Sequence, residues 1–280
     1  MKEVNKKVWL ITGASQGLGL ALVKHLLSQG QYVIATTRNP TKFEQTGLKD
    51  ENLKIVQLDI TSDSDVKEAV AGIMKKYGRI DVLVNNAGFG FIGGIEEATM
   101  DEIQDVIAIN VLASVRLVQA VLPGMRAVKN GHIINLSSIA GLISSPGIGI
   151  YNLAKYAVEG FSESLNLEVQ ALGIKVTIVE PGVFRTGFYD DSLVHAKNTI
   201  PDYDETVGKV KRMFSSIGGK QPGNPDLAAE AIFDIVNLEN PPLRLLLGKD
   251  AFSRAIKKMD DNKSEFERMQ AVTVSTDYID

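Results

Sequence analysis

The stretch Thr12-Gly13-Ala14-Ser15-Gln16-Gly17-Leu18-Gly19 governs the interpretation of this chain. An apolar run at residues 7–12 predicts a strand before it, and residues 17–29 predict a helix after it. Glycines at such a turn let the backbone approach a pyrophosphate, and the helix N-terminus offers free N–H groups and the positive end of its dipole. The spacing G-x-x-x-G-x-G therefore predicts a dinucleotide-binding loop, although it differs from the more familiar G-x-G-x-x-G.

Strands and helices alternate along the rest of the chain. Runs rich in β-branched and aliphatic residues predict strands at 7–12, 32–37, 54–58, 80–85, 132–137, 175–180 and 243–247. Helical periodicity predicts helices at 17–29, 64–77, 100–125, 151–171 and 226–238, with Ser64 placed to cap the second of them. The predicted fold class is α/β: a doubly wound, Rossmann-type, roughly seven-stranded parallel sheet with helices on both faces.

One domain is expected over residues 1–259. Residues 187–225 break the alternation, and the polar residues 260–280 predict a flexible C-terminal extension. The formal net charge of -4 gives no reason to expect a nucleic-acid partner. The chain holds no cysteine, which excludes disulfides and thiolate catalysis, and its histidines show no metal-ligand spacing. The apolar run near the N-terminus is too short for a signal peptide, and no membrane span is expected, so the expected location is the cytoplasm.

Two further glycine motifs compete with the first one. The segment 88–93 matches G-x-G-x-x-G, but no helix opens from it, so we expect an ordinary flexible loop. Residues 13–17 also match G-x-S-x-G, the nucleophile elbow of hydrolases. That interpretation would need Ser15 to pair with His132 or His195, and only one strand precedes the motif where an elbow normally follows several. A Ser15 hydrolase is therefore the weaker hypothesis.

The end of the second predicted strand bears on the choice of dinucleotide. An NAD site usually places a carboxylate there to bind the ribose 2′-hydroxyl. This chain reads Thr36-Thr37-Arg38-Asn39 instead. A guanidinium at Arg38 suits a 2′-phosphate through charge-assisted hydrogen bonds. NADP(H) is therefore the favoured cofactor, and NAD(H) is the second choice.

A tyrosine and a lysine four residues apart supply the candidate proton chemistry. Tyr151 and Lys155 share one face of the predicted helix 151–171. The reference pKa of tyrosine is about 10, and a neighbouring ammonium lowers it towards the range useful for acid–base catalysis. Ser138 ends the fifth strand, where open α/β sheets place their ligands, and Ser137 beside it is the competing choice.

Taken together, these motifs resemble the short-chain dehydrogenase/reductase family, single-domain type. The resemblance covers roughly residues 7–250 and rests on Thr12–Gly19, on Asn85-Asn86-Ala87-Gly88, on Asn110, Ser138, Tyr151 and Lys155, and on Pro181-Gly182 with Thr186. It implies a catalytic tetrad of Asn110, Ser138, Tyr151 and Lys155. Tyr151 would exchange the proton, Ser138 would bind the substrate oxygen, Lys155 would tune Tyr151 and bind the nicotinamide ribose, and Asn110 would hold a water.

The same resemblance implies the cofactor contacts. They are Gly13, Ser15, Gln16, Gly17, Leu18, Gly19, Arg38, Asp59, Ile60, Asn86, Ala87, Gly88, Tyr151, Lys155, Pro181, Gly182, Val183 and Thr186. Within this set Asp59 would contact the adenine, and Val183 and Thr186 would meet the carboxamide.

Substrate and assembly are implied only in outline. Residues 187–225 lie where this family places its substrate lid, and residues 86–97 are similar to members acting on steroids, retinoids and other lipophilic carbonyls. The expected activity is the interconversion of a ketone or aldehyde and an alcohol. The resemblance also implies a homodimer or homotetramer formed through the helices at 100–125 and 151–171. A non-catalytic NADP(H) sensor of the same fold is the alternative.

Overall fold

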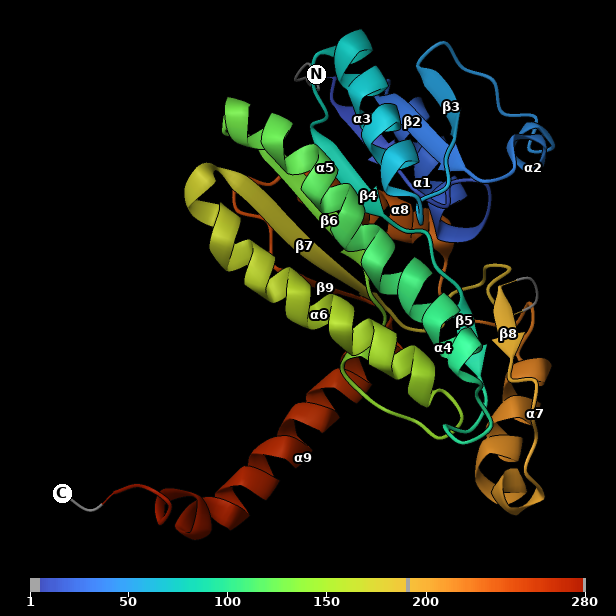
Figure 1. Ribbon diagram of the computed structural model, residues 1–280, viewed down its shortest axis with the longest axis vertical. Coiled ribbons are helices and arrows are strands. Elements are labelled where there is room, and N and C mark those ends of the chain that lie inside the picture. The colour runs from blue at the N-terminus through green and yellow to red at the C-terminus, as the bar shows by residue number, and fades with distance from the viewer. Residues whose placement is uncertain (1–5, 190–191, 279–280) are drawn as a thin grey trace.

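A parallel seven-stranded sheet forms the centre of the molecule (Figure 1). The computed structural model describes residues 6–189 and 192–278. The strands run in the order β3-β2-β1-β4-β6-β7-β9, which is the doubly wound arrangement that the sequence predicts. Their bounds are β1 (Val8–Ile11), β2 (Tyr32–Thr37), β3 (Leu53–Gln57), β4 (Val82–Asn85), β6 (Gly131–Leu136), β7 (Ile174–Pro181) and β9 (Arg244–Leu247).

Helices cover both faces of this sheet (Figure 1). Buried side chains of α1 (Gly17–Ser28) and α8 (Pro225–Val236) pack on one face. Those of α3 (Asp63–Tyr77), α5 (Ala113–Val128) and α6 (Gly149–Val169) pack on the other. Short helical segments complete the layers: α2 (Pro40–Glu44), α4 (Met100–Ile107), η1 (Ala108–Leu112), η2 (Ile139–Gly141) and η3 (Gln170–Leu172).

Trp9 is the only tryptophan of the chain and lies fully buried in the core on the α1 and α8 face. Its ring stacks on Phe233 of α8, with the centroids 6.4 Å apart. The indole N–H donates to Gln31 Oε1 at 3.4 Å, so the polar edge of this large side chain has a partner.

Two local expectations are wrong. Ser62 caps α3 by accepting the Asp65 N–H, so Ser64 is not the capping residue. The segment expected to be a flexible loop contains β5 (Gly90–Ile92), which pairs in parallel with β8 (Leu193–His195) in a separate small sheet. The partner strand lies about a hundred residues further along the chain, so no pattern within either segment predicts the pairing.

Residues 187–225 form the segment that we call the lid, of which 190–191 lie outside the described residues. It contains β8, η4 (Pro201–Tyr203), η5 (Asp204–Gly208) and α7 (Lys209–Ser216). The buried side chain of Glu97, which precedes α4, connects the lid to the rest of the domain. The Glu97 carboxylate accepts the N–H groups of Gly94 and Ile200 and pairs with Lys211 Nζ at 2.9 Å.

The C-terminal extension is helical as far as Val274, so the expected boundary at residue 259 falls inside a helix. Helix α9 (Lys249–Val274) leaves the end of β9 and runs away from the sheet (Figure 1). Strong helix formers and ion pairs one turn apart, such as Lys257 with Asp261, stabilise it without a core. Residues 279–280 lie outside the described part.

The continuous helical run Met100–Val128, formed by α4, η1 and α5, is apolar and long enough to cross a bilayer by length and composition. The run is not an uninterrupted apolar stretch, because Asn110 and Arg116 interrupt it, and the expectation of no membrane span stays a prediction. Within the described residues this run is the one candidate, and 44% of its most apolar window is buried inside the molecule. Packing of α5 against the sheet accounts for much of its apolar character.

Candidate active site

The loop between β1 and α1 has the geometry that phosphate binding requires. Gly13 and Gly17 adopt φ values of +62° and +55°, which disfavour residues with a side chain. A Cβ on Gly19 would lie 2.5 Å from Asn86 Nδ2, so this glycine permits close packing of the helix on the loop. The N-cap residue of α1, Gln16, makes no side-chain cap bond, which leaves N–H groups of the first turn available to an anion.

A cavity of about 540 Å³ opens above this loop. Its walls include eleven of the predicted cofactor contacts: Gly13, Ser15, Gln16, Gly17, Leu18, Arg38, Ile60, Asn86, Ala87, Gly88 and Thr186. Lys42 and Thr61, which the sequence interpretation missed, line it too. The glycine crowding, the uncapped helix end and the cation at Arg38 fit a phosphorylated dinucleotide.

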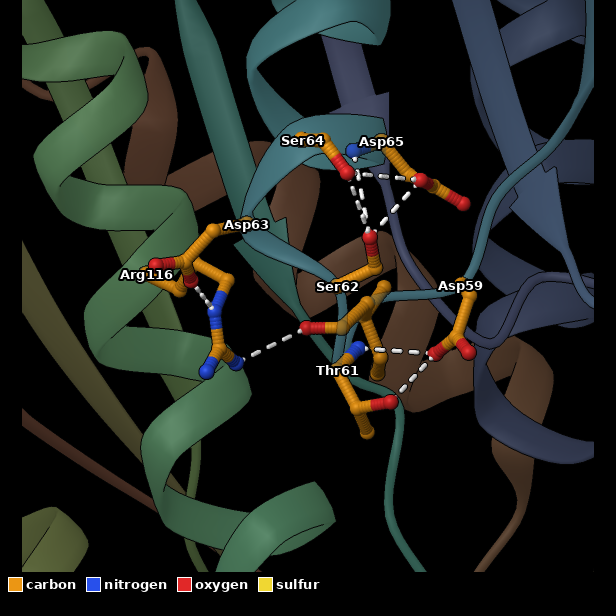
Figure 2. Close-up of polar contacts among 8 residues, drawn as sticks. Asp59, Thr61, Ser62, Asp63, Ser64, Asp65 and Arg116 are labelled. Atoms are coloured by element: carbon orange, nitrogen blue, oxygen red, sulfur yellow. Dashed lines mark hydrogen bonds and ion pairs between the residues drawn. The ribbon is translucent and has the colours of Figure 1, made fainter.

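Asp59, the predicted adenine contact, does not line this cavity. Its exposed carboxylate accepts the N–H of Thr61 at 2.8 Å and the Thr61 hydroxyl at 2.6 Å (Figure 2). These hydrogen bonds hold the pKa of Asp59 below its ordinary value. Arg116 of α5 stabilises the same turn: it donates to the Ile60 carbonyl and forms an ion pair with Asp63 (Figure 2). Asp59 thus shapes the turn that presents Ile60.

A second cavity, of about 390 Å³, lies beside the first and is mostly apolar. The two share lining residues, so they form one continuous site: Leu18, Asn86, Gly88, Phe89, Thr186 and Phe188. The members of the predicted tetrad, Asn110, Ser138, Tyr151 and Lys155, all line this second cavity. Pro181, Gly182 and Val183 line it as well.

Ser138 and Tyr151 come together from β6 and α6. Ser138 follows β6 and caps η2 by accepting the Ala140 N–H at 3.1 Å. Tyr151 lies in the first turn of α6, with its ring partly accessible from the cavity. The Ser138 hydroxyl donates to the Pro181 carbonyl at 3.4 Å, and it opposes the larger effect of burial on the pKa of Tyr151, so Ser138 rather than Ser137 lies beside the phenol. The Ser137 hydroxyl lies elsewhere, close to Gly141 and Glu159.

The net pKa shift of Tyr151 is opposite to the one expected. Burial raises the pKa of Tyr151 above its usual value, and the Ser138 hydrogen bond offsets this only in part. The Lys155 ammonium lies 5.6 Å from the centroid of the tyrosine ring. Tyr151 is therefore a neutral phenol near pH 7, the form that can donate a proton.

Lys155 is buried, and its ammonium donates to the Leu136 carbonyl at 2.8 Å. Burial lowers the pKa of Lys155 to about 8, and the charge of Glu159 opposes that shift. Asn110 lies in the π-helical turn η1, a local widening often found at functional sites. Its side chain donates to the Val106 carbonyl and accepts the Phe89 N–H at 3.2 Å.

The backbone of Val183, a predicted cofactor contact, makes two hydrogen bonds within the protein. Its N–H donates to Asp250 Oδ2 of α9 at 3.0 Å, and its carbonyl accepts the Gly223 N–H at 3.0 Å. Both backbone polar groups of Val183 therefore have partners within the protein, while the residue still lines the cavity, and its contact with the carboxamide stays a prediction. Thr186 does lie at the junction of the two cavities and contacts Gly17.

A buried charge network lies behind Lys155. Arg244 of β9 pairs with Glu159 and Glu163 of α6 and with Glu180 of β7. Glu180 is fully buried and Glu159 almost so. Burial raises the pKa of Glu180 to about 7, the negative charge of Glu159 adds to this, and Arg244 opposes it. The single arginine thus compensates two buried carboxyl groups.

The rival hydrolase pairing of Ser15 with His132 is not formed. His132 lies at the start of β6, in register with Val82 near the start of β4, and its ring bonds to Thr177 Oγ1 at 2.9 Å. Ser15 follows the end of β1 and therefore lies at the opposite edge of the parallel sheet. Burial lowers the pKa of His132 to about 3, which suits a neutral core residue.

The sheet and the two joined cavities define a dinucleotide-binding α/β protein in which a tyrosine and a lysine line the apolar cavity. The sequence profile described as "short chain dehydrogenase" matches residues 7–195. The chain belongs to this family of NAD(P)-dependent oxidoreductases.

Individual relatives match over nearly the whole chain. The 3-ketodihydrosphingosine reductase of Bacteroides thetaiotaomicron is 36% identical over 264 residues, which cover 93% of this chain and 96% of that protein. The solved structure of a short-chain dehydrogenase from Streptomyces avermitilis has a TM-score of 0.91 and 36% identity, covering 98% of this chain and 99% of that one. The structure of ElxO with NADP bound has a TM-score of 0.73 and 29% identity, covering 89% and 99%.

Proposed function

We propose that this protein interconverts the carbonyl of an apolar substrate and the corresponding alcohol with NADP(H), using Tyr151 as the general acid and base. One observation carries the proposal. Ser138, Tyr151 and Lys155 all line an apolar cavity that is continuous with a second cavity built around a phosphate-binding loop. The raised pKa of Tyr151 keeps its phenol neutral, the form that protonates an alkoxide in reduction, and the same group accepts the proton in oxidation.

Each polar residue has a part in this reaction. When bound, the cofactor supplies or accepts the hydride. Ser138 donates a hydrogen bond to the substrate oxygen, and the Tyr151 hydroxyl delivers its proton to that oxygen as charge develops. The Lys155 ammonium, held by the Leu136 carbonyl, stabilises the resulting tyrosinate. Asn110, anchored at both ends of its amide, is placed to hold a water that returns the proton.

An NADPH assay provides the test. Purified protein should oxidise NADPH when offered medium-chain and long-chain aldehydes or ketones, followed by loss of NADPH absorbance. The reverse reaction should appear with NADP⁺ and the matching alcohols. Tight NADPH binding without turnover, in both directions and across the panel, would instead favour the non-catalytic sensor.

The support for NADP(H) over NAD(H) comes from the end of β2. Arg38 and Lys42 both line the dinucleotide cavity near that point, and no described carboxylate lines it. The relative ElxO, whose structure holds NADP, adds weight to the proposal.

Replacing Arg38 with alanine should therefore raise the KM for NADPH about 10- to 100-fold, the effect of losing a charge-assisted hydrogen bond to a phosphate. The KM for NADH should stay within about twofold. Steady-state kinetics with both cofactors measure the effect, and Lys24→Ala on the exposed side of α1 is the control. Equal loss with NADPH and NADH would show that Arg38 does not recognise the 2′-phosphate.

We propose further that the protein is a homodimer or homotetramer assembled through α4, α5 and α6. Exposed apolar side chains on these helices and on η1 support the proposal: Met100, Leu112, Leu153, Tyr156 and Leu167. Sedimentation velocity at micromolar concentration should show the oligomer, and Leu153→Glu with Leu167→Glu should shift it towards the monomer. A wild-type protein that sediments as a monomer would overturn this proposal.

A further inference from the structure

The apolar cavity has an uneven distribution of charge. Of the described residues that line it, Lys155 and Arg254 carry a charge, and none is an aspartate or glutamate. Lys155 is committed to the reaction centre. Arg254 comes from α9, the element that the sequence interpretation treated in part as a tail.

Arg254 is held at the cavity rim by the first turns of α9. Ala251 and Ala255 on either side of it are buried against the body, and the Asp250 carboxylate accepts the Val183 N–H at 3.0 Å. Asp250, one turn before Arg254, thus directs its carboxylate to the loop after β7. Among the described residues, Arg254 has no ion pair or hydrogen-bond partner, and it is exposed.

A row of aromatic rings connects the reaction centre with this cation. The ring of Tyr151 lies 5.9 Å from that of Phe188, which lies 5.4 Å from that of Tyr189, centroid to centroid. Tyr189 and Arg254 both line the apolar cavity, and burial raises the pKa of Tyr189 to about 12, Asp250 adding to this and the charge of Arg254 opposing it. Two ring contacts of this kind span roughly 10 Å.

We propose that the substrate is amphipathic, with its carbonyl at Tyr151, its apolar body along the Phe188 and Tyr189 rings, and a carboxylate bound by Arg254. This inference rests on the proposed oxidoreductase function and adds a substrate class to it. None of the described residues that line this apolar cavity is acidic, so a guanidinium at its mouth favours an anionic group and disfavours a cationic one.

The test compares two aldehydes that differ in one charge: ω-oxododecanoate and its methyl ester. Wild-type protein should prefer the acid in kcat/KM, and Arg254→Ala should lower the ratio of acid to ester about tenfold, mainly through the KM of the acid. Arg254→Glu should lower it further, and Arg254→Lys should restore part of it. Because Arg254 is exposed, the preference of wild-type protein should weaken as ionic strength rises.

Arg268→Ala, on the exposed distal half of the same helix, is the matched control and should leave the ratio unchanged. Calorimetric titration with dodecanoate, which cannot be reduced, should show weaker binding to Arg254→Ala than to wild type. If wild-type enzyme reduces decanal but does not distinguish the acid from the ester, the proposed role of Arg254 is overturned and the proposed oxidoreductase function stands. Failure to turn over any of these aldehydes with NADPH would instead overturn the proposed function.

Discussion

Replacing Tyr151 with phenylalanine is expected to lower kcat for aldehyde reduction about 10³-fold. The change removes the hydroxyl that faces Ser138 and leaves the ring against Phe188, so the cavity keeps its shape. Hydride arrival at the carbonyl carbon leaves an alkoxide that needs a proton, and a positioned acid contributes about 10²- to 10⁴-fold to such a step. Binding of NADPH, measured by fluorescence titration, should stay within about threefold of wild type, because the phosphate loop is untouched.

Tyr278→Phe, at an exposed position close to the C-terminus, is the control, and its kcat should match wild type. If Tyr151→Phe kept more than a tenth of the wild-type kcat, the proton would have to come from another group, and Ser138 and Lys155 would be the next residues to replace.

The largest expected effect on folding comes from Arg244→Met. This change leaves Glu159 and Glu180 buried without their cation, whereas the methionine keeps much of the volume. Removing one partner of a buried ion pair costs about 3–5 kcal/mol of unfolding free energy. Urea unfolding followed by circular dichroism should show this loss, and the exposed pair of Arg212 with Asp204 offers a control whose removal should barely move the midpoint.

The pH dependence gives a second measure of the same change. The folded-state pKa of Glu180, about 7, is higher than its ordinary value of 4.5, so the folded protein binds more protons between these pH values and the group lowers stability as pH rises through that window. Loss of Arg244 should raise this pKa further. The deficit of Arg244→Met relative to wild type should therefore be largest near pH 8 and shrink as pH falls towards 4.5. A deficit independent of pH would point to packing rather than charge.

The sheet could be predicted because its strands are buried on both faces. The central strands read as nearly continuous apolar runs, such as Val8–Ile11 and Val82–Asn85, both of which are buried throughout. The positions of Ser138 and Tyr151 followed in turn, because the end of a parallel strand and the start of the next helix meet at one edge of the sheet.

Features that depend on residues far apart in the chain could not be predicted from the sequence. Gly90–Ile92 becomes a strand only because Leu193–His195 lies beside it, and nothing within either segment specifies that pairing. Ser62 and Ser64 are equally good capping residues, and the turn fixed by Asp59 decides between them. Similarly, no motif signals that Asp250 would bond to Val183.

The polarity of the C-terminal residues was also misleading. A helix with few buried residues is polar over most of its surface, so composition alone resembles a tail. In α9 only the first turns contact the body, through Ala251 and Ala255, and those turns carry the arginine that reaches the cavity. Small buried residues spaced four apart at the start of the segment were the available signal.

The position of Trp9 makes the protein its own spectroscopic reporter. The single indole is sealed between the sheet and α8, so its emission should be blue-shifted while the core is intact and move to longer wavelength when water reaches the ring. With no second tryptophan in the chain, that shift has one origin. Wild type and every variant described above can thus be compared by the emission of one chromophore, without a label or an engineered probe.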